Sequence, residues 1–256
     1  MTAIRAAAAT LALLAFAPDA KAEVFEVIHP DVEEGGVEVE ILNAVILEDV
    51  GAGDEQSIHE FAVGYGVTSF WKTTLAVEFA AIDGDGFEYE AFEWENVFLF
   101  PFGGGGHDHD HDHGGDEFGL EALGLYAALE VPNEGGFDEG ALVLGPVVEA
   151  ALGPVEALGN LFVEIPFEGG EEEALVYALA LSTPVSENIA IGLEAFGEFE
   201  NAFASGTASE HFVGPAAYFD FDIGGGRSIE PRAAVLFGTE SAQPDATLSF
   251  NVEFKF

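Results

Sequence analysis

A run of alternating histidine and aspartate in the middle of the chain is the segment best suited to hold a metal ion. Imidazole nitrogens and carboxylate oxygens are ligands for Zn(II), Ni(II) and Cu(II), and the flanking glycines leave the backbone free to gather them. The chain has no cysteine, so such a site would accept several metals and select poorly among them. The candidate metal ligands are His107, Asp108, His109, Asp110, His111, Asp112 and His113.

The same composition has a second interpretation, a solvated loop that binds metal in a test tube and has no metal function in the cell. In either case, binding through imidazole should weaken below about pH 6, where the rings protonate. No cofactor is required by any other feature of the sequence.

Carboxylates at every second position of several strand-like segments form the other group of chemically active residues. If the more apolar face of each segment faces lipid, these side chains face an interior that favours cations and excludes anions. This predicted lumen lining comprises Glu38, Glu40, Glu60, Glu78, Glu149, Glu164, Glu194, Glu198, Asp220, Asp222, Glu230 and Glu253, with Arg232 and Lys255 as basic members. Phe162, Phe196, Tyr218 and Leu236 share the inward face and could instead fill it.

The elements that must position these residues are about twelve β strands separated by Gly-, Asp-, Asn- and Pro-rich turns. Strands of about 9–11 residues are long enough to cross a bilayer when tilted. The expected strands are 36–47, 58–67, 73–82, 87–98, 120–131, 141–151, 155–165, 174–182, 189–199, 211–222, 229–238 and 246–256. We therefore expect one all-β domain, an antiparallel transmembrane β-barrel with both termini in the periplasm.

The connections alternate in length, as they do in such barrels. The first, third and later odd connections are mostly long and acidic, whereas the even ones are tight turns. The exception is 101–117, which contains the His-Asp run and which this parity places in the periplasm. In the fourth strand the apolar residues change face, which predicts a register shift at a bulge. Phe70, Trp71, Phe100 and Phe102 fall near the periplasmic strand ends and are candidates for an aromatic girdle.

The last eleven residues alternate strictly, with Leu248, Phe250, Val252, Phe254 and Phe256 on one face. This ending resembles the C-terminal signal of Gram-negative outer-membrane β-barrel proteins. The resemblance implies that Phe250, Val252, Phe254 and Phe256 are read by the barrel-assembly machinery, and that the protein lies in outer-membrane lipid.

The beginning of the chain has the features of a secretory signal peptide over 1–22. Arg5 precedes an apolar stretch that is too short to span a bilayer, and Ala20-Lys21-Ala22 offers a small-residue cleavage site. The remaining chain, 23–256, would carry a net charge of −43 with histidine neutral. Such acidity repels nucleic acid. It is also typical of proteins adapted to high salt, and a secreted soluble β-sandwich from a salt-loving organism is the competing fold.

Catalysis is not expected. Ser57 and His59 share a face near the predicted outer rim, where a lipid-cleaving enzyme would need them, but Ser-x-His occurs often by chance. No phosphate-binding loop or zinc-protease motif is present, and His29 and His211 are isolated.

The whole pattern is similar to that of small, uncharacterised proteobacterial outer-membrane barrels, including those associated with phenol-degradation gene clusters. That resemblance implies a passive channel or transporter for small solutes or cations. Two alternatives stay open: a metal-binding outer-membrane protein that acts through the His-Asp run, and a closed structural barrel.

Overall fold

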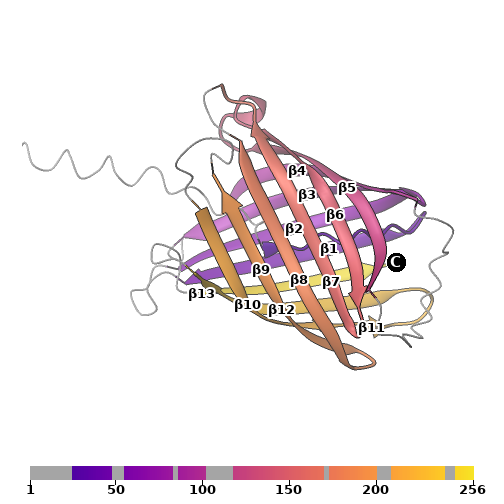
Figure 1. Ribbon diagram of the computed structural model, residues 1–256. Coiled ribbons are helices and arrows are strands. Elements are labelled where there is room, and N and C mark those ends of the chain that lie inside the picture. The colour runs from indigo at the N-terminus through magenta and orange to yellow at the C-terminus, as the bar shows by residue number, and fades with distance from the viewer. Residues whose placement is uncertain are drawn as a thin grey trace, which may run out of the picture.

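The chain forms one closed antiparallel β sheet (Figure 1). The computed structural model describes residues 25–47, 55–82, 86–101, 118–169, 173–200, 209–239 and 246–256. Among these residues, no helix is both long and apolar enough to cross a membrane. The predicted signal peptide over 1–22 and the His-Asp run lie outside the described residues.

From β1 to β10, and again from β11 to β13, each strand pairs with the next along the chain, and two further ladders close the sheet. The strands are β1 (Val37–Leu47), β2 (Glu55–Thr68), β3 (Trp71–Ile82), β4 (Glu88–Leu99), β5 (Phe118–Pro132), β6 (Ala141–Leu152), β7 (Val155–Pro166), β8 (Ala174–Ser186), β9 (Ile189–Phe199), β10 (Ser209–Phe219), β11 (Phe221–Asp222), β12 (Ser228–Gly238) and β13 (Ala246–Lys255). A short 3-10 helix, η2 (Gly136–Asp138), lies between β5 and β6. Because β1 pairs with β13, and β10 pairs with β12, the sheet closes on itself. The two-residue β11 pairs with β12 beyond the end of β10, so β10 and β11 together form one strand of the wall. The barrel therefore has twelve strands around its wall, as predicted.

The two ends of the barrel differ in their connections. We call the end where β1 begins and β13 ends the C-terminal rim, and the other end the distal rim. Val37 and Phe256 exchange backbone hydrogen bonds of 2.9 and 3.2 Å at the C-terminal rim. The turns at 69–70, 153–154 and 187–188 also lie there, and the longer connections, apart from the one between β4 and β5, lie at the distal rim. The parity of loop lengths was therefore predicted correctly, and β4 and β5 place the ends of the His-Asp connection at the C-terminal rim.

The register shift expected in the fourth strand is present. Glu78 of β3 pairs with Ala91, but Phe79 pairs with Tyr89, so Glu90 is an extra residue in β4. A one-residue insertion reverses the face on which the following side chains point. This bulge explains why the apolar pattern of β4 changes face in the sequence.

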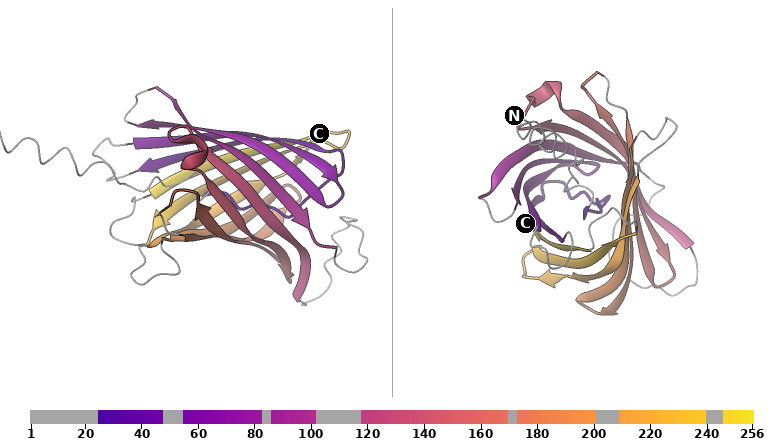
Figure 2. Two further views of the ribbon diagram at one scale, coloured as in Figure 1. Left: turned by 90° about the horizontal axis from the view of Figure 1, so that it is seen from above. Right: turned by 90° about the vertical axis from the view of Figure 1, so that its left-hand side faces the viewer.

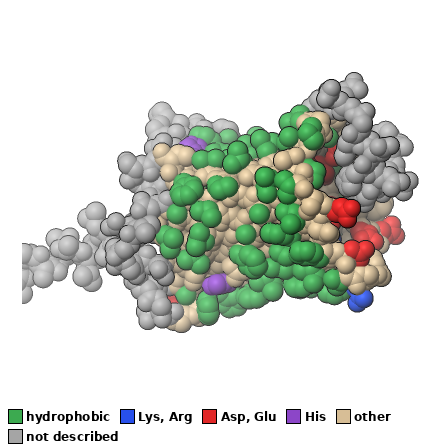
Figure 3. Space-filling model, turned by 90° about the horizontal axis from the view of Figure 1, so that it is seen from below, with side chains coloured by type: hydrophobic (Ala, Val, Ile, Leu, Met, Phe, Trp, Pro, Cys, Tyr) green, Lys and Arg blue, Asp and Glu red, His purple; other side chains and the backbone are tan. Residues whose placement is uncertain are grey.

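The outer face of the barrel is an apolar band (Figure 3). Large hydrophobic side chains point outward at alternate positions of the strands and are about half exposed, among them Phe61, Leu75, Leu161, Leu193 and Phe250. A soluble monomer rarely exposes a continuous apolar surface of this extent, whereas a barrel in lipid requires one. The secreted β-sandwich that competed with the barrel is therefore wrong.

Aromatic side chains gather on the outer face near the ends of the strands. Trp71 stacks on Phe98 with their ring centroids 6.0 Å apart, and Phe70 and Phe100 are exposed beside them at the C-terminal rim. Tyr177, Phe199 and His211 form a similar group close to the distal rim. Such belts are typical of the two interfaces of a membrane barrel. Phe102 lies outside the described residues.

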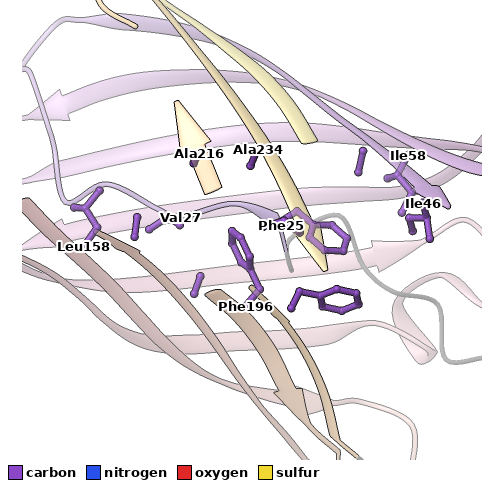
Figure 4. Packing of buried hydrophobic residues seen from close by; sticks show 13 residues of the cluster. Phe25, Val27, Ile46, Ile58, Leu158, Phe196, Ala216 and Ala234 are labelled. Atoms are coloured by element: carbon purple, nitrogen blue, oxygen red, sulfur yellow. The ribbon is translucent and has the colours of Figure 1, made fainter. Parts of the chain in front are cut away.

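A segment that precedes β1 runs inside the barrel, which the sequence did not indicate. Figure 2 shows residues 25–36 in indigo within the ring of strands. We call this stretch the lumen segment. Phe25 and Val27 belong to a cluster of inward-facing side chains from β1, β2, β7, β8, β9, β10 and β12, so the segment packs between opposite walls of the barrel (Figure 4). The first strand begins at the C-terminal rim, but the chain before it lies in the lumen.

Candidate functional site: the barrel lumen

The inner face carries most of the carboxylates that alternation had placed there. Glu38, Glu60, Glu164 and Glu194 are buried on this face, at most 9% exposed. Glu40, Glu78, Glu149, Glu198, Glu230 and Glu253 point inward beside them, with Arg232 and Lys255. Strand pleating alone produces this lining, because side chains at every second position face the same side.

A belt of carboxylates lies in the half of the lumen nearer the distal rim. Glu60 of β2 pairs in register with Glu78 of β3, and Glu93 of β4 pairs with Glu130 of β5. Carboxylate oxygens of Glu60, Glu78 and Glu93 lie within 4.8 Å of one another. Glu164 on β7 continues the belt around the wall. We call Glu60, Glu78, Glu93, Glu130 and Glu164 the carboxylate belt.

The other half of the lumen mixes both signs of charge. Lys72 Nζ lies 2.6 Å from Glu38 Oε2, and Lys255 Nζ lies 3.1 Å from Glu230 Oε2 and 3.5 Å from Glu253 Oε1. The ammonium groups of both lysines are therefore partly neutralised by the wall itself. Among the described residues, the inner-face cations are these two lysines and Arg232, so the carboxylates outnumber them.

Arg232 links four neighbouring strands. Its guanidinium donates to both carboxylate oxygens of Glu194 and, at 2.9 Å, to Ser249 Oγ. Tyr218 donates a hydrogen bond of 2.7 Å to the same Glu194, and Arg232 lies over the ring of Phe196 at 5.8 Å. A bidentate pair with its remaining donors satisfied is the stable form of a buried ion pair. This network ties β9, β10, β12 and β13 together where the sheet closes.

The lumen segment is held by specific contacts along its length. Asn160 on β7 accepts a hydrogen bond from Ile28 N at 2.7 Å and donates one to Ile28 O at 2.9 Å. Phe25 packs edge-on against Phe196 and Phe212, with ring centroids 5.9 and 5.3 Å away. At the C-terminal rim, Asp31 lies 3.4 Å from Lys255 Nζ, and Gly35 N donates to Gly66 O at 2.8 Å.

The structure places two of the predicted residues outside the lumen lining and adds others to it. Asp220 and Asp222 are exposed at the C-terminal rim rather than in the lining, and Asp222 accepts a hydrogen bond from Gly224 N at 2.6 Å. Glu93, Glu95 and Glu130 line the lumen but were not in the predicted set. The bulge in β4 hid Glu93 and Glu95, because the face of that strand could not be assigned. Lys72 was missed because it was placed in a turn, although β3 begins one residue before it.

The remaining candidate residues do not lie in the lumen. Ser57 and His59 point to the outer face near the distal rim, where His59 Nδ1 lies 2.7 Å from Asn43 Oδ1 and the ring packs against Phe87. Phe250, Val252 and Phe254 are on β13, with Phe256 directly after it. His107 to His113, with the intervening aspartates, lie outside the described residues.

Comparison with solved structures finds the same fold in outer-membrane proteins. An outer membrane channel of the COG4313 type from Pseudomonas putida F1 aligns with a TM-score of 0.58 at 11% identity, over 90% of this chain and 99% of that one. The fold is that of an outer-membrane β-barrel. The KdgM porin, in complex with disordered oligogalacturonate, aligns with a TM-score of 0.50 at 8% identity over 86% of this chain and 98% of that one. No protein-family model and no curated protein sequence matches this chain. These two neighbours are a channel and a porin, and this barrel shares their architecture.

Proposed function

We propose that this outer-membrane barrel is a passive channel for small solutes and that its lumen favours cations. The observation that carries the proposal is the inner face, where the carboxylate belt has Glu60 and Glu93 only 3% exposed. Fixed negative charge in a narrow, low-dielectric passage raises the local concentration of cations and repels anions. Among the described residues, the basic side chains of the lumen, Lys72, Arg232 and Lys255, each pair with a carboxylate outside the carboxylate belt.

The lumen segment limits the size of the path. Phe25 packs against Phe196 and Phe212 on one side of the lumen, and the same cluster includes Ile46 and Ile58 on the other side. A solute would have to pass beside the segment or wait for it to move. We propose that the segment narrows the channel to small ions and that larger solutes pass only when it leaves the wall. A permanently closed structural barrel is the opposing possibility, and the same packing supports it.

The test is the reversal potential of the refolded protein in a planar bilayer under a KCl gradient. We expect a reversal potential whose sign indicates that K⁺ passes more readily than Cl⁻. The triple variant Glu60→Gln, Glu78→Gln, Glu93→Gln should move the potential toward zero, since three carboxylates close together become neutral. The matched control neutralises three exposed carboxylates near the C-terminal rim, Glu33, Glu34 and Glu187, and should leave selectivity almost unchanged. Insertion without any current would favour the closed structural barrel.

Export and assembly belong to the same proposal. We propose that the chain is delivered by its signal peptide over 1–22 and inserted into the outer membrane of a Gram-negative bacterium by the barrel-assembly machinery. The terminal aromatic Phe256, 54% exposed at the end of β13, supports this because it is accessible for recognition. The C-terminal rim would then face the periplasm.

Metal binding through the His-Asp run is a second candidate function. The ligand-rich sequence of His107 to His113 supports it, and β4 and β5 place the ends of that connection at the C-terminal rim. Deleting 103–115 should abolish Zn(II), Ni(II) or Cu(II) binding in calorimetry while the barrel still refolds. Unchanged metal tolerance of cells that carry the deletion would count against a physiological role.

A further inference from the structure

We infer that the lumen segment is held by a proton-dependent latch, a hydrogen bond between the carboxyl groups of Glu26 on the segment and Glu40 on the barrel wall. The inference deepens the proposed channel function and rests on it, because it names what releases the segment that narrows the path. It concerns a contact that is distinct from the uncharged contacts at Phe25, Val27 and Ile28.

The contact itself requires a proton. Glu26 and Glu40 line the same cavity between the segment and the wall, and their side chains are joined by a hydrogen bond. Two ionised carboxylates have only acceptor oxygens, so they can form this bond only when one of them carries a hydrogen. The pair therefore holds one proton between the segment and β1 as long as the segment is seated.

The surroundings of Glu26 oppose its ionisation. Burial, followed by the charges of Glu40, Glu60 and Glu95, raises the pKa of Glu26 well above that of an ordinary carboxyl group, and Lys72 offsets this only in part. The groups that face the latch from each neighbouring element are Glu38 and Glu40 on β1, Glu60 on β2, Lys72 on β3, Glu95 on β4, Glu253 and Lys255 on β13, and His29 and Asp31 on the segment itself. Both lysines, the basic side chains near Glu26 among the described residues, already pair with wall carboxylates.

The direction of the pH effect follows from the seated state. The pKa of Glu26 is raised when the segment is seated and returns to its ordinary value when the segment is released into water. The seated state is therefore favoured at low pH, and this advantage is lost as pH rises through the raised pKa. A single proton can shift the equilibrium between seated and released states by at most about tenfold per pH unit. Release at higher pH would leave the carboxylate-lined lumen open, whereas acid would keep it closed.

The test measures exposure of the segment and does not depend on current. The chain has no natural cysteine, so Val27→Cys, buried at 9% exposure, provides one thiol that a small reagent can reach only after release. Glu33→Cys, which is exposed on the same segment, corrects for the ordinary rise in thiol reactivity with pH. In the full-length protein in lipid vesicles, the ratio of the two labelling rates should rise between pH 5 and pH 9, by up to about tenfold per unit.

The decisive comparison adds Glu26→Gln, which keeps a neutral hydrogen-bonding side chain at all pH values. Its labelling ratio should stay low at every pH. The control Glu34→Gln, which alters an exposed side chain of the same segment, should show the same rise of the labelling ratio with pH as the unaltered protein. If Glu26→Gln fails to refold, Glu40→Gln makes the same test from the wall. A flat ratio in the unaltered protein, or an undiminished rise in Glu26→Gln, would overturn the latch. A channel without the latch would still conduct, and a latch without a channel would still label, so the two proposals can fail separately.

Discussion

Asn160 on β7 provides the strongest single test of how the lumen segment is held. Its amide makes two hydrogen bonds to the backbone of one residue, Ile28, at 2.7 and 2.9 Å. An intramolecular hydrogen bond contributes about 0.5–1.5 kcal/mol net, so the pair holds the segment by about 1–3 kcal/mol. Replacing Asn160 by Leu, which has the same branching at Cγ and cannot hydrogen-bond, should increase the released fraction by roughly 5- to 150-fold.

The assay is labelling of Val27→Cys at a fixed pH, together with the frequency of open events in a planar bilayer. The matched control is Asn43→Leu, an equivalent change on the outer face, where Asn43 donates to Phe250 O at 3.0 Å. The control should label as slowly as the parent. An Asn160→Leu protein that refolds normally and labels no faster would refute the reasoning, because the segment would then be held by its apolar contacts alone.

Two further predictions concern the stability of the wall. Arg232→Leu leaves Glu194 buried without its bidentate partner and should destabilise the barrel by about 3–5 kcal/mol, measured as a lower denaturant midpoint for unfolding from detergent; an unchanged midpoint would show that the pair of Arg232 with Glu194 does not stabilise the wall. Leu193→Arg, at an outward position near the middle of β9 that is 56% exposed, should cost about 2–4 kcal/mol in lipid. Leu152→Arg, at the end of β6, should cost about 0–1 kcal/mol, and equal costs at both positions would mean that the apolar band does not face lipid.

The strands could be predicted because alternation has a period that no helix shares. All of the expected segments correspond to observed strands within a few residues, and the continuous apolar outer face follows from the same pattern. The bulge at Glu90 marks the limit of that method. The sequence showed that the faces of β4 conflict, but the inward position of Glu93 and Glu95 depends on the pairing of β4 with β3.

The lumen segment could not be predicted, because nothing local to it indicates its partners. Its residues alternate over too short a run to define a strand, and its anchor Asn160 is 132 positions from Ile28 along the chain. Phe25 likewise depends on Phe196 and Phe212, which are brought together only when the barrel closes. The sequence did place Phe196 and Leu236 on the inward face, and so indicated that the interior could be filled. It did not indicate that the lumen segment would fill it.

The measurement that tests the central proposal most directly is single-channel conductance of the full-length protein beside a variant that lacks residues 25–34. The barrel closes through the pairing of β1 with β13, which does not involve the deleted residues. We expect small, cation-selective currents from the full-length protein and larger currents, still cation-selective, from the deletion variant. Correctly inserted barrels that pass no current in either form, or a deletion variant that prefers anions, would contradict the proposal.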